Sequence, residues 1–142
     1  MQPTGPPLGL LLATTSKAVG RAFNRALADS GGSIPIWLIL NALKRESRRS
    51  QADLARAVGI EGPTLTRHLD GMEQAALVRR QRGTPDRRSV QVALTRKGSA
   101  AHARLLKAVI SFNQQLRTGL TSDDEATLRT LLRQLQANVD QT

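Results

Sequence analysis

Positive charge is concentrated in one short stretch of the sequence. The run RRQRGTPDRRSVQV, residues 79–92, holds five arginines around a turn at residues 83–86. Guanidinium groups bind the backbone phosphates of nucleic acids, and we therefore expect Arg80 and Arg82 to contact phosphate. The alternative for both is an exposed strand arginine that holds no ligand.

The same stretch contains a single acid, Asp86, which phosphate would repel. An ion pair with a neighbouring arginine would let this carboxylate fix the shape of the loop. A simple turn-forming role is the alternative, because Pro-Asp pairs are common in turns. The two roles are compatible, and we expect Asp86 to serve both.

A second set of polar residues follows Pro63, at the start of a predicted helix. Threonine hydroxyls can bond base edges or phosphates, and an arginine can bind O6 and N7 of guanine together. We therefore expect Thr64, Thr66 and Arg67 to contact DNA. The alternatives are helix capping by Thr64 and plain surface solvation of the other two. His68 could reach a phosphate or lie partly buried in its helix.

Ser50 and Gln51 stand at the beginning of another predicted helix. The sequence from Ser50 to Asp53 fits a capping box in its broader Ser-x-x-Asp form. Because a helix N-terminus attracts anions, we expect Ser50 and Gln51 to donate hydrogen bonds to phosphate.

The overall charge also favours a polyanionic partner. The formal net charge is +10 and the pI is near 11.6, as is typical of proteins that bind nucleic acid. Residues 79–97 hold seven basic residues and one acid, whereas residues 118–142 hold four acids and two arginines. A surface that needs only solvation would spread its charges more evenly.

Composition excludes several other classes of protein. With two Phe, one Trp and no Tyr, the chain has too few aromatic rings to stack single-stranded bases, which favours duplex DNA. The absence of cysteine excludes disulfides and thiol-based redox sensing. The apolar runs are too short to span a bilayer, and residues 1–7 lack the basic region of a signal peptide. We expect a flexible N-terminal lead, no membrane contact and a cytoplasmic location.

No group of residues has the pattern of a catalytic site. His68 and His102 are far apart in the sequence, no carboxylates stand at metal-ligand spacing, and no glycine-rich loop follows a strand. The serines lack a plausible base. We expect no enzymatic activity, no metal and no cofactor.

Hydrophobic periodicity and capping residues predict the elements that position these side chains. Helices are expected at 8–28, from Ser33 to a polar connection at 45–49, from Ser50 to Val58, from 61 onward, from Thr95 to about Arg117, and from Thr121 onward, with strands at 77–82 and 89–94. The two short helices that meet at Gly59 form a candidate helix-turn-helix. The predicted fold class is mainly α with a small β-hairpin wing (α+β).

The terminal helices carry more leucine than a monomer of 142 residues comfortably buries. We expect a second copy of the chain to cover this apolar surface, with an ordinary helical core as the alternative. The residues concerned are Leu8, Leu11, Leu12, Leu116, Leu120, Leu128, Leu131, Leu132 and Leu135.

The order of these elements resembles that of the MarR (multiple-antibiotic-resistance regulator) family over about residues 8–139. The most specific stretches are QADLARAVGI at 51–60, PTLTRHLD at 63–70, and the residues from Asp86 to Gly98, which end in VALTRKG. This last stretch is similar to the wing signature of the family, Asp-x-Arg leading into Leu-Thr-x-x-Gly. Within the family, the chain looks closest to the SlyA-like branch.

The resemblance implies a homodimeric bacterial or archaeal transcription regulator, a repressor that binds a palindromic operator in double-stranded DNA and is nucleoid-associated when bound. It places a recognition helix in the major groove and Arg87 and Arg88 at the wing tip in the minor groove, where a narrow A·T-rich groove attracts arginine. Many such proteins release DNA on binding a small aromatic or phenolic acid. Trp37 would lie at such an effector pocket, with Lys17 and Arg21 to balance the acid, although core packing and solvation are the alternatives.

The expected organisation is a flexible lead at 1–7 followed by one MarR-like domain at 8–142. Residues 33–97 would form the winged helix-turn-helix part, and residues 8–30 and 98–140 would form dimerisation helices. A different function stays open: an architectural protein that binds DNA with little sequence preference and has no effector.

Overall fold

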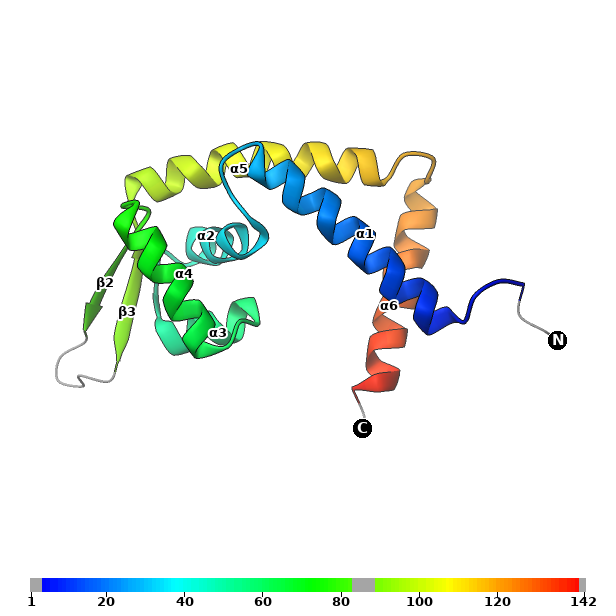
Figure 1. Ribbon diagram of the computed structural model, residues 1–142, viewed down its shortest axis with the longest axis horizontal. Coiled ribbons are helices and arrows are strands. Elements are labelled where there is room, and N and C mark those ends of the chain that lie inside the picture. Colours follow the sequence, from blue (N-terminus) through cyan, green and yellow to red (C-terminus); the bar gives the residue numbers. More distant parts are fainter. Residues whose placement is uncertain (1–3, 83–88, 141–142) are drawn as a thin grey trace. The chain divides into compact units, whose positions relative to one another are not determined.

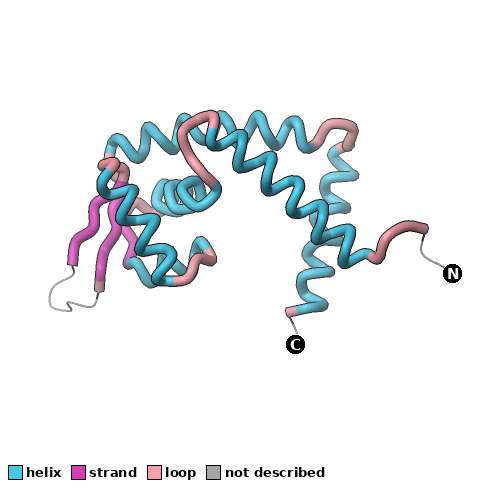
Figure 2. Tube along the Cα trace, in the orientation of Figure 1, coloured by secondary structure: helices cyan, strands magenta, loops and turns pink. Residues whose placement is uncertain are grey.

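A computed structural model describes residues 4–82 and 89–140 of the chain. Within those ranges it contains six helices and a small antiparallel sheet (Figures 1 and 2), which confirms the predicted fold class. In chain order the elements are α1 (Leu8–Ala28), α2 (Ile34–Arg45), β1 (Arg48–Ser50), α3 (Gln51–Val58), α4 (Gly62–Gln74), β2 (Val78–Arg82), β3 (Val90–Leu94), α5 (Arg96–Leu116) and α6 (Ser122–Val139). The chain divides into two compact units, and the boundary between Val109 and Ile110 falls inside α5.

Side-chain caps explain why several helices begin where they do. Ser33 accepts a hydrogen bond from the backbone N–H of Ile36 at the start of α2, and Ser50 accepts one from Asp53 at the start of α3. Such a bond satisfies a backbone donor that has no partner inside the helix. The predicted starts at Ser33 and Ser50 are therefore confirmed.

The sheet has one strand more than the sequence predicts. β3 lies in the centre, and it pairs antiparallel with β2 on one side and with β1 on the other. Residues 45–49 were predicted to be a polar connection, which is wrong for Arg48 and Arg49 because both belong to β1. A strand of three residues is too short to show an alternating pattern, and it forms because β3 offers it hydrogen bonds.

Two glycines are required by the geometry around the sheet and the helix-turn-helix. Gly59 ends α3 in the left-handed region, at φ +70°, where a side chain would be strained. At Gly98, a Cβ atom would lie 2.1 Å from the carbonyl oxygen of Leu77. That contact places the first turn of α5 directly against the residue that precedes β2.

The core of the first unit lies between α2, α3, α4, β2, β3 and α5. Leu54 of α3 and Leu65 and Leu69 of α4 are fully buried in this core. The remaining members of this core are Leu27, Trp37, Ile39, Leu40, Leu43, Met72, Val78, Val92, Ala101 and Leu105. Burial of a large apolar side chain contributes roughly 1.5–3 kcal/mol, and α4 buries three of them here, Leu65, Leu69 and Met72.

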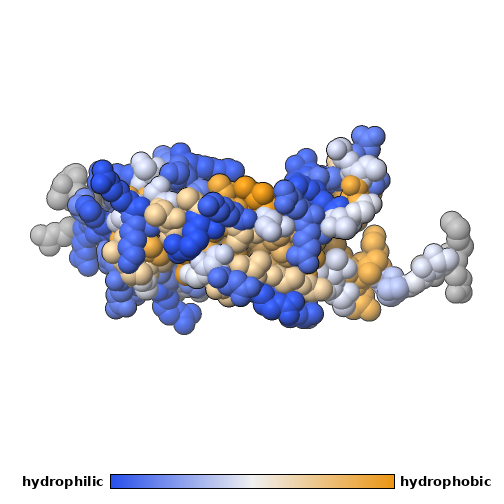
Figure 3. Space-filling view, turned by 90° about the horizontal axis from the view of Figure 1, so that it is seen from above, coloured by the Kyte–Doolittle hydropathy of each residue, from blue (hydrophilic) through white to orange (hydrophobic). Residues whose placement is uncertain are grey.

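The leucines at the beginning of α1 are exposed. Leu8, Leu11 and Leu12 are each at least 40% accessible, and Leu10 is exposed beside them. The space-filling view shows hydrophobic residues at the surface near the N-terminal end of the chain (Figure 3). A chain of this size usually covers such a surface.

The second unit is held together mainly by α6 and the end of α5. A complete capping box starts α6: the Thr121 side chain accepts from the Asp124 N–H, and the Asp124 carboxylate accepts from the Thr121 N–H. Leu135 is half-buried. The other leucines of this unit that were predicted to lie at a dimer interface are at least 40% exposed, namely Leu116, Leu120, Leu128, Leu131 and Leu132. In the described ranges, no helix combines the length and the apolar character needed to cross a membrane.

Candidate nucleic-acid interface

The predicted recognition helix, α4, has three faces with different roles. Leu65 and Leu69 lie on the buried face. Thr66 and Glu73 lie on a second face, where they line a cleft with the wing strand β2. The third face carries Thr64, Arg67 and His68. Arg67 is exposed and the other two are half-buried. This open face is the one that could contact a ligand as large as a DNA duplex.

The first turn of α4 has free hydrogen-bond donors. Glu61 occupies the N-cap position but makes no side-chain cap bond, and Pro63 stands in the first turn. The N–H groups of Gly62 and Thr64 therefore have no capping side chain. Uncapped N–H groups at the positive end of a helix can bind a phosphate oxygen. Because Glu61 itself provides no cap, an external anion could satisfy these donors.

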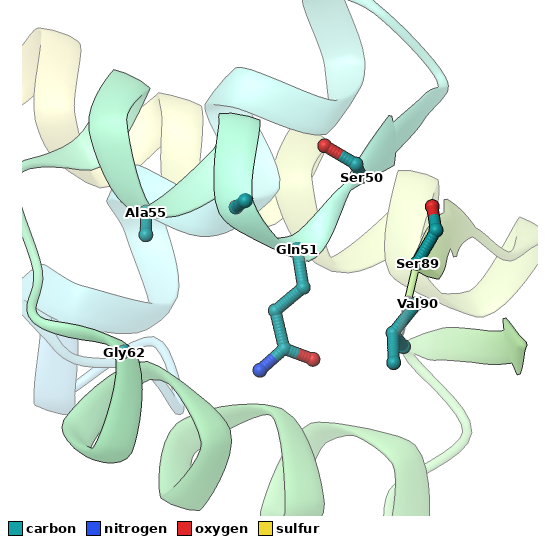
Figure 4. Close-up of a pocket in the computed structure, with 7 residues that line it drawn as sticks. Ser50, Gln51, Ala55, Gly62, Ser89 and Val90 are labelled. Atoms are coloured by element: carbon teal, nitrogen blue, oxygen red, sulfur yellow. The ribbon is translucent and has the colours of Figure 1, made fainter. Parts of the chain in front are cut away.

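Gln51 connects α3 to α4. Its Nε2 donates to Thr66 Oγ1 at 2.7 Å, and that hydroxyl in turn donates to the carbonyl oxygen of Gly62 at 3.0 Å. In Figure 4 the Gln51 side chain extends from α3 into the space that Gly62 and Val90 border. The hydrogen bonds hold the beginnings of the two helices of the corner together.

Two adjoining clefts share Gln51 and Val90. One has a volume of about 400 Å³ and includes Ser50 and Ser89, whereas the other has a volume of about 520 Å³ and includes Thr66 and Arg82. Ser50 and Gln51 were predicted from one helix start and Thr66 from another, and the structure brings the three residues together along these clefts. His68 lies on the open face of α4 instead.

Arg80 braces the wing strand against the recognition helix. Its Nη2 atom lies 2.5 Å from Asp70 Oδ1 and 3.0 Å from Glu73 Oε1. The Arg80 backbone N–H also donates to Glu73 Oε2 at 3.0 Å. The side chain of Arg80 is only 18% exposed. Two carboxylates already neutralise its charge, and so the structure gives Arg80 a bracing role. The phosphate contact of Arg80 stays a prediction.

Other arginines of the sheet are more accessible. Arg79 and Arg82 on β2 and Arg48 on β1 are exposed. Arg48 makes a long hydrogen bond of 3.4 Å to Gln81 across the sheet, and no ion pair holds Arg79 or Arg82 to an acid of the described ranges. Within the described ranges, no acid neutralises the charges of these three arginines.

Comparisons with known proteins agree with this geometry. A model of the MarR family matches residues 34–89. The crystal structure of transcriptional regulator PA3341 is 36% identical to this chain, covers 96% of it and 100% of its own length, and superposes with a TM-score of 0.78.

The chain belongs to the MarR family.

Two further solved structures show the same MarR fold. A cysteine-to-serine mutant of MarR from E. coli, complexed with operator DNA, is 27% identical, with 91% of this chain and 93% of that chain covered and a TM-score of 0.82. The PcaV transcriptional regulator from Streptomyces coelicolor is 23% identical, with 96% of this chain and 100% of that chain covered and a TM-score of 0.83. The SlyA-like branch within the MarR family stays a prediction.

Three predicted MarR wing residues, Asp86, Arg87 and Arg88, lie outside the described residues. Their proposed pairing and minor-groove contacts therefore stay predictions. The described strands β2 and β3 lead to them, with Arg82 paired to Val90 in the register of the sheet.

The residues predicted for an effector site lie in different surroundings. Trp37 is 8% exposed and belongs to the core, where its ring stacks on His102 with 5.0 Å between centroids. Lys17 and Arg21 are exposed on α1. Trp37 is therefore packed in the core and Lys17 and Arg21 are solvated, as in the alternatives given for these residues.

Sequence reasoning missed the residues that support this MarR interface. Asp70 and Glu73 were not singled out, although acids three apart on one helix face could have indicated a basic partner. His102 was considered only as a catalytic residue. It is buried, and its Nε2 lies 3.1 Å from Asn41 Oδ1. No cluster of metal-binding side chains occurs in the part of the chain that the structure describes.

Proposed function

We propose that this MarR-family protein is a homodimeric repressor that binds a palindromic operator in double-stranded DNA. The observation that carries the proposal is the open face of α4, where Arg67 is exposed beside helix N–H donors that no side chain caps. An exposed arginine on a helix of this kind can read guanine in the major groove, while the free N–H groups bind a phosphate nearby. A solved MarR structure, 27% identical to this chain, contains operator DNA, which supports the proposal.

The proposed contacts divide into two kinds. Thr64, Thr66 and Arg67 would contact base edges, whereas Ser50, Gln51 and Arg82 would contact phosphates. The remaining residues of the proposed interface are His68, Arg80, Asp86, Arg87 and Arg88. Phosphate contacts set affinity and its salt dependence, and base contacts set sequence preference.

The test is a selection of bound duplexes from a random pool, followed by affinity measurements on the best sequence and on a scrambled one. Arg67→Ala should cost about 1–3 kcal/mol on the selected duplex and relax preference at one base position. The control is Arg133→Ala on α6, which removes the same charge from an exposed site. Equal weakening of Arg67→Ala on both duplexes would show that Arg67 contacts only phosphate.

The homodimer would use the exposed leucines of α1 and of the second unit. A pair of recognition helices about one helical turn apart, roughly 34 Å, would match a palindromic operator. Sedimentation velocity should show a dimer for the parent protein and a monomer for Leu131→Glu, which puts a charge on an exposed leucine of α6. Gln134→Glu on the same helix is the charge-matched control and should stay dimeric.

Release by a small aromatic acid belongs to the same proposal. Trp37, Lys17 and Arg21 are its candidate residues, and a cytoplasmic location follows from DNA as the partner. Titration of aromatic acids into the complex with the selected duplex tests this part, and a complex that no acid dissociates would count against it. The second candidate function is that of an architectural protein. Such a protein would bind its best duplex little more tightly than a scrambled duplex, whereas a repressor would bind its operator much more tightly than other DNA.

A further inference from the structure

The Thr66 hydroxyl is used twice inside the protein. It donates to the carbonyl oxygen of Gly62, one turn earlier in α4, at 3.0 Å, and it accepts from Nε2 of Gln51 on α3 at 2.7 Å. A hydroxyl has one proton and two acceptor lone pairs. Because its proton is engaged with Gly62, Thr66 has no donor left for a base edge or a phosphate oxygen.

The same two bonds fix the orientation of the Gln51 amide. A hydroxyl that donates to Gly62 cannot donate to Gln51 as well, so the amide presents its N–H₂ group and not its oxygen to Thr66. One N–H of that group is bound to Thr66, and the second is left for an outside acceptor. Gln51 can therefore hold Thr66 and donate to a phosphate at the same time.

The bond from Gln51 selects one rotamer of Thr66. A threonine inside a helix divides between two rotamers, because its hydroxyl can bond the carbonyl three or four residues earlier. The hydroxyl position that bonds Gly62, four residues earlier, is the one that also meets Gln51. In this rotamer the hydroxyl has two partners instead of one, which favours it over the other.

The position of Thr66 leaves it open to a ligand. It is half-buried and borders the cleft of about 520 Å³ between α4 and the sheet, one turn after the start of α4. Residues near the N-terminus of a recognition helix are the ones that reach base edges. With the hydroxyl turned to Gly62 and Gln51, the methyl group is the part of Thr66 that remains for a base. Thymine is the base that presents a methyl group in the major groove.

We propose that Thr66 recognises a thymine through contact of the two methyl groups, and that Gln51 is the positioning residue that holds Thr66 in the required rotamer. The proposal rests on the proposed function, since it names a base that α4 would recognise beside the one read by Arg67. The hydroxyl of Thr66 sets the rotamer, and the methyl group sets the base preference. The contact is apolar, so its contribution should not depend on salt as phosphate contacts do.

The role of Gln51 is tested by NMR of the full chain without DNA. Three-bond couplings to the Thr66 methyl carbon report how much of each rotamer is populated. The parent protein should show one rotamer, and Gln51→Met, which removes the donor and keeps an unbranched side chain, should show an average of two. Thr130 on α6 is the internal control. Its hydroxyl bonds the carbonyl of Ala126 and has no second partner in the described ranges, so it should be averaged in both proteins.

Two results would overturn the positioning role. One is an averaged Thr66 in the parent protein. The other is a single Thr66 rotamer that survives in Gln51→Met. Neither result depends on whether the protein binds an operator, because the measurement uses no DNA.

The methyl contact is tested on the duplex selected from the random pool. Each thymine is replaced in turn by uracil, which lacks only the C5-methyl group. At one position of each half-site, uracil should weaken binding of the parent protein about fourfold, as expected for the loss of one methyl contact of about 0.8 kcal/mol. Thr66→Val keeps a methyl group without the hydroxyl and should show the same uracil effect. Thr66→Ser keeps the hydroxyl without the methyl group and should bind both duplexes within about 1.5-fold of each other.

Thr64→Ser is the matched control, because it removes a methyl group from the other threonine at the start of α4. The uracil effect should stay about fourfold in this variant. A uracil effect that survives Thr66→Ser, or that Thr64→Ser removes, would overturn the methyl contact. So would a parent protein that prefers its selected duplex about 10³-fold and has no uracil-sensitive position. A preference within about tenfold would instead overturn the proposed function and the methyl contact together.

Discussion

Arg80 on β2 is bound by Asp70 and Glu73 on α4, with nitrogen–oxygen distances of 2.5 and 3.0 Å. The Arg80 backbone N–H is bound by Glu73 as well, at 3.0 Å. The first wing strand, β2, and the recognition helix, α4, are therefore joined through both a side chain and the main chain. A bound DNA would meet α4 and β2 as one preformed surface.

Arg80→Gln should lower the free energy of unfolding by about 1–2 kcal/mol, because two half-exposed carboxylates lose a charged donor that water replaces only in part. Urea denaturation measures the loss. Arg82→Gln on the same strand is the control and should change stability by less than about 0.5 kcal/mol. Equal urea midpoints for the two variants would contradict the brace.

The brace should also depend on pH. Hydrogen bonds from the Arg80 side chain and backbone lower the pKa of the Glu73 carboxyl below its ordinary value. A lowered pKa means that the folded state releases this proton more readily than the unfolded state does. The stabilisation is therefore present above the unfolded pKa, about 4.3, and is lost as pH falls through the lower folded pKa.

Glu73→Gln should make stability depend less on pH in this acidic window. Chemical denaturation between about pH 6 and pH 3 would show it. Glu61→Gln is the control, because Glu61 is an exposed residue on the same helix that makes no cap bond. The explanation fails if Glu61→Gln flattens the profile as much as Glu73→Gln does.

Most of the helical architecture could be predicted from the sequence, because caps and apolar periodicity are local signals. Ser33, Ser50 and Gly59 marked helix ends that the structure confirms. β1 could not be predicted, since its three residues pair with a strand about forty residues later in the chain. A pairing of that kind has no local pattern.

The candidate site could be predicted in part, because some of its residues also follow local signals of a helix start. Thr64, Thr66 and Arg67 follow a recognisable helix start, and the structure gives them an open face and a cleft. The bond between Gln51 and Thr66 depends on how α3 and α4 are packed. The Trp37–His102 stack joins residues 65 positions apart, and only the folded core brings such residues together.

His102 should make stability depend on pH nearer neutrality. Burial, with a smaller contribution from the charge of Lys44, lowers the pKa of this imidazole below its ordinary value. The His102 ring stacks on Trp37 and lies within hydrogen-bond distance of Asn41, and its burial there favours the neutral form of the ring. Its contribution is therefore fully present above about pH 6.5, the unfolded value, and is lost as pH falls through the lower folded pKa.

His102→Asn should show less loss of stability than the parent protein between about pH 7.5 and pH 5, each measured against its own value at high pH. Measuring each protein against its own stability at high pH removes the pH-independent loss of stability that the missing Trp37–His102 stack would cause. His68→Asn is the control, since these are the only two histidines of the chain. If His68→Asn alone flattens the profile, His102 is not the group responsible.

Gly98 and Gly71 should respond in opposite ways to alanine. A Cβ at Gly98 would lie 2.1 Å from the Leu77 carbonyl oxygen, whereas a Cβ at Gly71 would meet no atom within 4 Å. Gly98→Ala should lower the free energy of unfolding by about 1–3 kcal/mol through overpacking. Gly71→Ala should raise it by about 0.5–1 kcal/mol, because alanine favours a helix interior. Thermal and urea unfolding check both, and equal changes would contradict the close contact of α5 with Leu77.

The specificity ratio for DNA tests the central claim most directly. The parent protein's affinity is measured by fluorescence anisotropy at about 150 mM salt, on its best selected duplex and on a scrambled duplex of equal length and composition. Reading of bases by the open face of α4 predicts a ratio of about 10³ or more. A ratio within about tenfold would contradict it and would favour an architectural protein that holds DNA by charge alone.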